Sequence, residues 1–162
     1  MAKTVHTRYF ISMAMKLPLE TIQKVQSMLN AVPFMKALSQ DDVNELAYSL
    51  NQRHFMKGET IIRQGEPGKL FYLCFKGTVG VYRERLFGRK KIAALGPGDF
   101  FGEISLVDNV PRTATVMGEE DGIMYTLARD AFEAILLKNP SVSEVIRKIA
   151  AERKQAGVSA TA

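Results

Sequence analysis

Glycines divide residues 52–128 into short apolar segments, and this feature constrains the fold more than any other in the sequence. The turn signals are Lys57-Gly58, Gly65-Glu66-Pro67-Gly68, Lys76-Gly77, Gly88 and Gly96-Pro97-Gly98. Between them lie predicted strands at 54–56, 60–63, 70–75, 78–85, 90–95, 99–101, 113–116 and 123–127. Many short strands at regular spacing are typical of a sandwich, a barrel or a jelly roll. The segment 70–75 is apolar throughout, which favours a strand covered on both faces.

Helical periodicity replaces the strand pattern on both sides of this region. The spacing of Ile22, Val25 and Leu29 predicts a helix over 19–31 that Pro33 ends. Ser39 and Asp42 form a capping box that starts a second helix, which runs to residue 50. Beyond the strands, the pattern predicts helices over 129–138 and 142–155, separated by Asn139-Pro140, with Ser141 as the second cap.

Length and composition indicate one soluble globular domain. The chain has 162 residues, of which 46% are hydrophobic and 24% charged. The single cysteine, Cys74, excludes an internal disulfide framework and fits a reducing, cytoplasmic location, with its thiol buried in a strand. No apolar run is long enough to span a membrane. We expect residues 1–18 to form a basic extension and 156–162 a disordered tail.

The net charge of +5 raises the question of nucleic acid. Basic residues gather around an expected hairpin turn at Gly88 and again in the last helix, as Arg83, Arg85, Arg89, Lys90, Lys91, Arg147, Lys148, Arg153 and Lys154. No aromatic interleaving and no helix-turn-helix pattern accompany them. We therefore interpret the first cluster as a solvated hairpin tip and expect no nucleic-acid partner.

The stretch from Gly98 to Val116, GDFFGEISLVDNVPRTATV, carries the strongest chemical signal. It predicts a strand end, a glycine, a short helix over 103–107, a turn and a new strand. A helix start beside a glycine offers unpaired N–H groups that suit an anion. Arg112 adds a planar cation, and Glu103 adds an acceptor. Glu103 and Arg112 could also form a purely structural ion pair, which remains an alternative.

This stretch resembles the phosphate-binding cassette of the cyclic-nucleotide-binding domain family. The resemblance rests on Phe101-Gly102-Glu103-Ile104-Ser105-Leu106, followed after a variable turn by Arg112-Thr113-Ala114-Thr115-Val116. It extends over roughly residues 33–155 and is similar to ligand-binding domains of bacterial cyclic-nucleotide-gated channels and catabolite-activator-type sensors. The resemblance implies an α+β fold: an eight-stranded β-roll, or jelly roll, with helices on its N-terminal side and a C-terminal lid helix. The domain is expected over 19–155, with a helical flank at 19–50, the roll at 52–128 and terminal helices at 129–155.

The resemblance also assigns roles to residues. Arg112 and the backbone of Gly102, Glu103, Ile104 and Ser105 would hold a cyclic phosphate, and Glu103 would accept the ribose 2′-hydroxyl. Thr113, followed by Ala114, would contact the phosphate or the exocyclic amine of guanine. Arg153 resembles a lid arginine, although a solvated helix-end charge is an equal alternative. Ile146 and Ile149 are expected near the purine.

The leading hypothesis is a non-catalytic sensor for cAMP, cGMP or both that needs no cofactor and moves its terminal helices when the ligand binds. The main alternative is the cytoplasmic gating domain of a channel, detached from its pore; a family member that binds nothing remains possible. A cupin-type metalloenzyme would need clustered ligands, whereas only His6 and His54 occur, far apart. A catabolite-activator-type transcription factor needs a further DNA-binding domain. The downstream partner is undetermined, and a homodimer through the terminal helices is conceivable.

Overall fold

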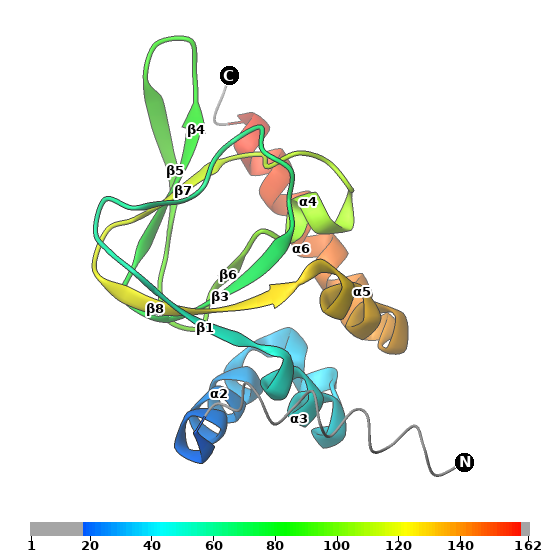
Figure 1. Ribbon diagram of the computed structural model, residues 1–162. Helices are drawn as coiled ribbons and strands as arrows, with labels where there is room; N and C mark the ends of the chain where they lie inside the picture. Colours follow the sequence, from blue (N-terminus) through cyan, green and yellow to red (C-terminus); the bar gives the residue numbers. More distant parts are fainter. Residues whose placement is uncertain (1–17, 160–162) are drawn as a thin grey trace.

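The computed structural model describes residues 18–159, which form two four-stranded antiparallel sheets with helices around them (Figure 1). The strands are β1 (Asn51–Phe55), β2 (Thr60–Ile62), β3 (Leu70–Lys76), β4 (Val79–Glu84), β5 (Arg89–Leu95), β6 (Phe100–Phe101), β7 (Thr115–Gly118) and β8 (Gly122–Ala128). The helices are α2 (Leu19–Ala31), the 3-10 helix η1 (Pro33–Ala37), α3 (Gln40–Ser49), α4 (Glu103–Val107), α5 (Arg129–Lys138) and α6 (Pro140–Ser159). The predicted α+β class and eight-stranded roll are confirmed. Apart from Pro18, the basic extension predicted for 1–18 lies outside the described residues.

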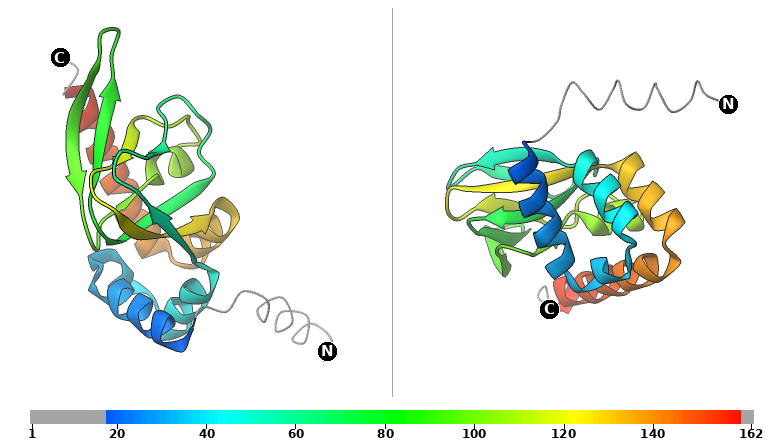
Figure 2. Two further views of the ribbon diagram at one scale, coloured as in Figure 1. Left: turned by 60° about the vertical axis from the view of Figure 1, so that its left-hand side comes forward. Right: turned by 90° about the horizontal axis from the view of Figure 1, so that it is seen from below.

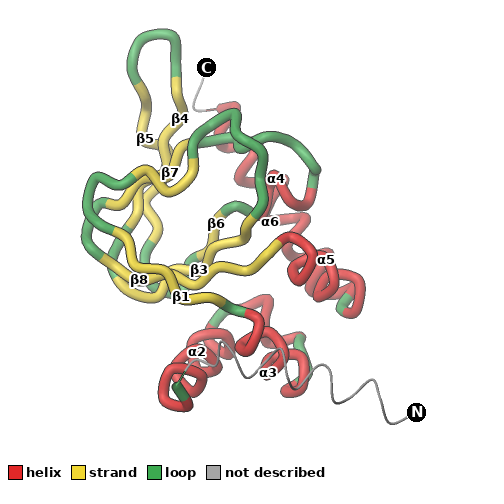
Figure 3. Tube along the Cα trace, in the orientation of Figure 1, coloured by secondary structure: helices red, strands yellow, loops and turns green. Residues whose placement is uncertain are grey.

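The two sheets wrap into a roll because each contains strands from both halves of the region. One sheet has the order β1-β8-β3-β6 and the other the order β2-β7-β4-β5. Figure 3 shows the strands enclosing the roll, with α2 and α3 below it and α4, α5 and α6 along one side. The roll therefore leaves one flank on which the terminal helices can meet the short helix α4.

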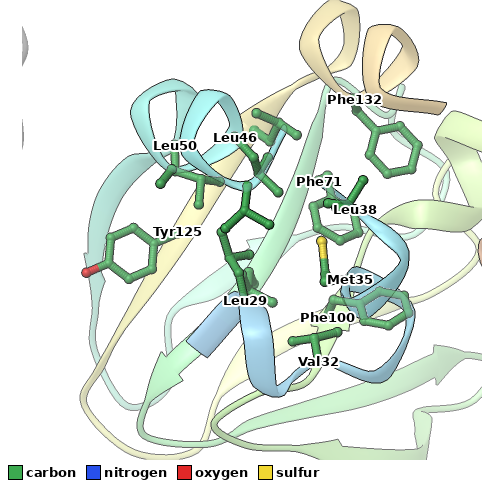
Figure 4. Packing of buried hydrophobic residues seen from close by; sticks show 14 of the residues in the cluster. Leu29, Val32, Met35, Leu38, Leu46, Leu50, Phe71, Phe100, Tyr125 and Phe132 are labelled. Atoms are coloured by element: carbon green, nitrogen blue, oxygen red, sulfur yellow. The ribbon is translucent and has the colours of Figure 1, made fainter. Parts of the chain in front are cut away.

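The helices α2, η1 and α3 cover the outer face of the β1-β8-β3-β6 sheet. The side chain of Ser39 accepts a hydrogen bond from the backbone N–H of Asp42 at 3.1 Å, so the predicted cap of α3 is confirmed. Leu29 and Leu46 from the helices pack with Phe71 from the sheet in one buried cluster (Figure 4). Full burial of one such side chain contributes about 1.5–3 kcal/mol, so this cluster fastens the helices to the roll.

Strand β3 is buried on both faces, as its apolar sequence predicts. Phe71 and Leu73 belong to the cluster beneath the helices. Tyr72 and Cys74 belong to a second cluster inside the roll. Alternate residues of a strand point to opposite faces, so β3 forms a wall between two apolar compartments.

Both ends of the last helix differ from the sequence prediction. The last helix begins at Pro140 instead of residue 142, since proline fits the first position of a helix, whose N–H needs no partner. The same helix continues to Ser159, so 156–159 do not belong to a disordered tail, and 160–162 lie outside the described residues. Gly157 is buried in the last turns of α6, which shows that this end of the helix is packed.

Candidate functional site

A cavity of about 180 Å³ lies between the roll, α4 and the end of α6. All of the site residues predicted from the sequence line it: Gly102, Glu103, Ile104, Ser105, Arg112, Thr113, Ala114 and Arg153. The opposite wall is apolar and comes from β2, β4, β5 and β7, through Ile62, Val81, Ile92, Ala93, Leu95 and Val116. The cavity thus pairs one polar, charged side with one apolar side, as small-molecule sites commonly do.

Gly102 sets the direction in which α4 leaves β6. It is the N-cap of α4 and has a φ of 87°, in the left-handed region that favours glycine. A Cβ at this position would lie 2.9 Å from the carbonyl oxygen of Leu70 and 2.9 Å from Nη1 of Arg112. Both the backbone angle and the close approach therefore require glycine here.

The Arg112 guanidinium is held beneath the start of α4. Its Nη1 donates to the carbonyl of Gly102 at 2.9 Å and to Oγ of Ser105 at 2.7 Å, and its Nη2 donates to the carbonyl of Leu70 at 2.7 Å. The residue is only 5% exposed. These bonds occupy three of the five N–H groups of the guanidinium and fix its plane.

The surroundings of Arg112 are shaped to admit a large cation. Its guanidinium carbon lies 5.7 Å from the centre of the Tyr72 ring, within cation–π range. Gly68 also makes room, because a Cβ there would collide with Oγ of Ser105. Burial lowers the pKa of Arg112, whereas the neighbouring Tyr72 and Glu103 oppose that shift. An arginine remains protonated at neutral pH, so the cavity contains a buried positive charge.

Glu103 is paired with Arg153 of α6. Its side chain is 2% exposed, and Oε1 accepts a hydrogen bond from Nη1 of Arg153 at 2.8 Å. The same nitrogen donates to the carbonyl of Phe100 at 2.7 Å, and the guanidinium lies 4.5 Å from the Phe100 ring centre. Arg153 is therefore not a solvated helix-end charge, and it fastens α6 across the mouth of the cavity. The alternative of a direct Glu103–Arg112 ion pair is not what the structure contains.

Two further arginines contact the site. The sequence did not single out Arg129, and the assignment of Arg83 to a solvated hairpin tip is wrong. Nη2 of Arg129, the first residue of α5, donates to the carbonyl of Gly68 at 2.7 Å and, more weakly, to that of Ser105 at 3.4 Å. Arg83 on β4 lines the cavity, and its buried Nε has no hydrogen-bond partner among residues 18–159. A Cβ at Gly157 would collide with its guanidinium. The Arg129–Gly68 contact and the Arg83–Gly157 contact each join segments more than sixty residues apart, so no local pattern signals them.

The expectation that Ile146 and Ile149 contact a purine is wrong. Ile146 is 2% exposed within the core cluster beneath the helices, and Ile149 packs against that cluster. The residues of α6 that line the cavity are Arg153, Ala156 and Gly157. One helical stripe thus serves the core along its first half and the cavity at its end.

Residues 18–159 contain neither a metal-binding cluster nor a membrane-spanning helix. No cluster of three or more histidine, cysteine, aspartate or glutamate side chains suited to a metal occurs in that range. None of the helices in that range is both long enough and apolar enough to cross a bilayer.

A family model described as "Cyclic nucleotide-binding domain" matches residues 52–139, which is more than half of the chain. The chain belongs to this family. The matched region includes the complete roll, α4 and α5, so the family resemblance proposed from residues 101–116 is confirmed.

Relatives in this family come from proteins of different architecture. The cyclic AMP receptor protein of Thermus thermophilus is 34% identical over 75% of this chain and 56% of its own length. A cyclic nucleotide-gated potassium channel of Mesorhizobium japonicum is 33% identical over 80% of this chain and 35% of its own. The regulatory domain of Toxoplasma gondii PKA, solved with cAMP, superposes with a TM-score of 0.76 at 25% identity, over 82% of this chain and 51% of that one. The chain thus spans between about a third and just over half of these relatives.

Proposed function

We propose that this chain is a non-catalytic sensor that binds a 3′,5′-cyclic purine nucleotide, cAMP or cGMP, in the cavity beneath α4. The single observation that carries the proposal is the buried Arg112 guanidinium, held by Gly102, Ser105 and Leu70 within a cavity that Glu103 also lines. A fixed, buried cation in a cavity suits a ligand whose negative charge cannot be lost near neutral pH. Membership of the cyclic nucleotide-binding domain family supports the same ligand class.

In this proposal, the phosphate binds to the N–H groups of Arg112 that the protein leaves available. The start of α4 supplies further donors. Its first backbone N–H groups have no carbonyl partner within the helix, so they are available to the phosphate; they belong to Gly102, Glu103, Ile104 and Ser105. Each charge-assisted bond contributes about 1.5–3 kcal/mol. Thr113 and Ala114 would then lie along the ligand between phosphate and base.

Glu103 would accept the ribose 2′-hydroxyl. A carboxylate is an acceptor only and can take more than one donor, so the hydroxyl can bind beside Arg153 or in its place. The cavity of about 180 Å³ is smaller than the ~300–1,000 Å³ of most small-molecule sites. We therefore expect the side chain of Arg153, or the end of α6 that carries it, to shift when a nucleotide enters.

This shift would be the signal. The ligand changes what Glu103 and Arg153 bind, and α6 is also tied to the turn after α4 by Lys154, whose Nζ lies 3.1 Å from Oδ2 of Asp108. A ligand shifts a conformational equilibrium only through different contacts in the two states, and the Glu103–Arg153 pair supplies such a difference. The terminal helices would thereby report occupancy to a partner, in the cytoplasm as the single cysteine suggests.

Calorimetric titration of the intact chain with cAMP, cGMP and the non-cyclic 5′-monophosphate AMP tests the proposal. We expect saturable binding of at least one cyclic nucleotide and at least tenfold weaker binding of AMP, which carries a further negative charge and lacks the phosphate ring. Absence of binding to both cyclic nucleotides at millimolar concentration would refute the sensor function. A preference for cGMP would favour a guanine contact from Thr113.

The regulatory unit of a channel is the second candidate. It is favoured by the extent of the alignment with the Mesorhizobium japonicum channel, which covers 80% of this chain. The two functions share the nucleotide site and differ in what the terminal helices contact. Cyclic-nucleotide-dependent ion flux from a longer protein that contains this chain would support the channel, and a soluble partner bound only with nucleotide would support the free sensor.

A further inference from the structure

The β4–β5 hairpin projects beyond the rest of the molecule. Figures 1 and 2 show both strands continuing past the roll, with the turn at their far end standing away from other elements. The last paired residues are Glu84 and Arg89. Beyond them the backbone N–H of Arg85 donates to the carbonyl of Gly88 at 2.9 Å, and Gly88 has a φ of 78°. A backbone hydrogen bond therefore closes the turn at the end of the β4–β5 hairpin.

The apex of this hairpin is apolar. Leu86 and Phe87 are each 90% exposed, more than any other large hydrophobic residue described. Isolated exposed hydrophobic residues are common on protein surfaces, but two adjacent ones at the point farthest along a projecting arm form a convex apolar tip. Neither side chain contributes to the two core clusters.

Cations surround this apolar tip. Arg85 precedes it, and Arg89, Lys90 and Lys91 follow, all of them exposed. Carboxylates are fewer: Glu84 lies 3.5 Å from Arg89, and Glu119, which directly follows β7, pairs with Lys91. Residues 85–91 contain four cations and no acid, so the tip retains a positive field.

We propose that the β4–β5 tip is a site that binds the surface of a membrane containing anionic lipid. Leu86 and Phe87 would enter the boundary between head groups and acyl chains, while the cations behind them contact the lipid phosphates. Apolar and aromatic side chains flanked by basic ones are the combination that holds peripheral segments at such surfaces. A convex tip needs no preformed pocket in its partner, which favours a fluid lipid layer over a folded protein.

Contacts with phosphate groups alone would explain the cations of the hairpin but not its apolar apex. Nucleic acid would attract Arg85 and the lysines but would leave Leu86 in water, since base contacts are made by aromatic stacking and by polar groups. Lipid uses both the charge and the apolar apex. The inference does not depend on nucleotide binding, because none of residues 85–91 lines the cavity.

A tryptophan probe reports insertion directly, because the chain contains no tryptophan. Phe87→Trp in the full chain, mixed with phosphatidylcholine vesicles containing about a third phosphatidylserine, should show blue-shifted emission and quenching by brominated acyl chains. Pure phosphatidylcholine vesicles should give a much smaller shift. Leu137→Trp provides the matched control, since Leu137 is 83% exposed on a different surface, and its emission should not change.

Vesicle cosedimentation of charge and tip variants supplies the energetic test. Leu86→Ser/Phe87→Ser should weaken binding by about tenfold or more. Arg85→Gln/Lys90→Gln should weaken it by about 25-fold, at about fivefold per cation. Lys24→Gln/Lys148→Gln, which removes the same charge from exposed helix positions, should have less than half that effect on a logarithmic scale.

Three outcomes would overturn the proposal. No blue shift at position 87 would exclude insertion. Equal losses from the tip variant and the control at positions 24 and 148 would reduce the effect to overall charge. Binding of single-stranded DNA that depends on Phe87 and exceeds binding to anionic vesicles would assign the tip to nucleic acid instead.

Discussion

Replacing Arg112 by alanine should destabilise the protein even in the absence of any ligand. The guanidinium satisfies three acceptors, the carbonyls of Gly102 and Leu70 and Oγ of Ser105, and it is 5% exposed. Each hydrogen bond to a charged group is worth about 1.5–3 kcal/mol, but bonds that share one donor group are not additive. Leaving a buried acceptor without its donor costs about 1–3 kcal/mol, so with three acceptors affected we expect the free energy of unfolding to fall by about 3–5 kcal/mol.

Urea denaturation followed by circular dichroism measures this loss, with Arg63→Ala as the matched control. Arg63 is an exposed arginine whose Nε lies 3.8 Å from Oε1 of Glu66, and its removal should change stability by less than about 0.5 kcal/mol. Arg112→Lys keeps the charge without the planar fork and should fall between the two. If Arg112→Ala were as stable as the Arg63→Ala control, the guanidinium would not brace α4, and the reasoning would fail.

The remaining predictions concern the carboxylate, the lid and the buried thiol. Glu103→Gln should weaken calorimetric binding of cAMP far more than that of 2′-deoxy-cAMP; equal losses would remove the ribose assignment. Arg153→Ala should speed amide hydrogen exchange in the last turns of α6, because it breaks the bonds to Glu103 and to the Phe100 carbonyl; unchanged exchange would show that this residue does not fasten the helix. Burial raises the pKa of Cys74 from 9.0 to about 12, so the native thiol keeps its proton where the unfolded chain loses it. The free energy of unfolding should therefore fall as pH rises from 9 to 12, by up to about 1.4 kcal/mol per pH unit, and this contribution should be absent from Cys74→Ala, so that it remains as the difference in slope between the two proteins. Identical slopes in the two proteins would contradict the burial of an ionisable thiol.

Local sequence predicted the elements well where one residue type decides the backbone. Glycine and proline marked the turns of the roll, and Ser39 marked the start of α3. The cassette from Gly102 to Ala114 was predicted as a unit because its glycine, its short helix and its arginine are close in sequence. The continuous apolar run at 70–75 also predicted that both faces of β3 would be buried.

Contacts between distant segments were not predictable from one sequence. The helix predicted over 142–155 is present, but only the docking of the helix decides that Ile146 enters the core while Arg153 reaches Glu103. The helix α6 continues past residue 155, and its Gly157 lies against Arg83 of strand β4. The 3-10 helix η1 is also absent from the sequence prediction, because Pro33 indicates only the end of the preceding helix.

The two-residue strand β6 lies where the separate parts of the molecule come together. Phe100 belongs to the cluster beneath the helices, Phe101 stacks on Tyr72 inside the roll at 4.7 Å, and Gly102 follows at once. A small displacement of this strand would disturb the packing of both apolar compartments. It would also disturb the hydrogen bond from Arg153 of α6 to the Phe100 carbonyl. The short strand β6 therefore links both apolar compartments, the start of α4 and the end of α6 through two consecutive residues.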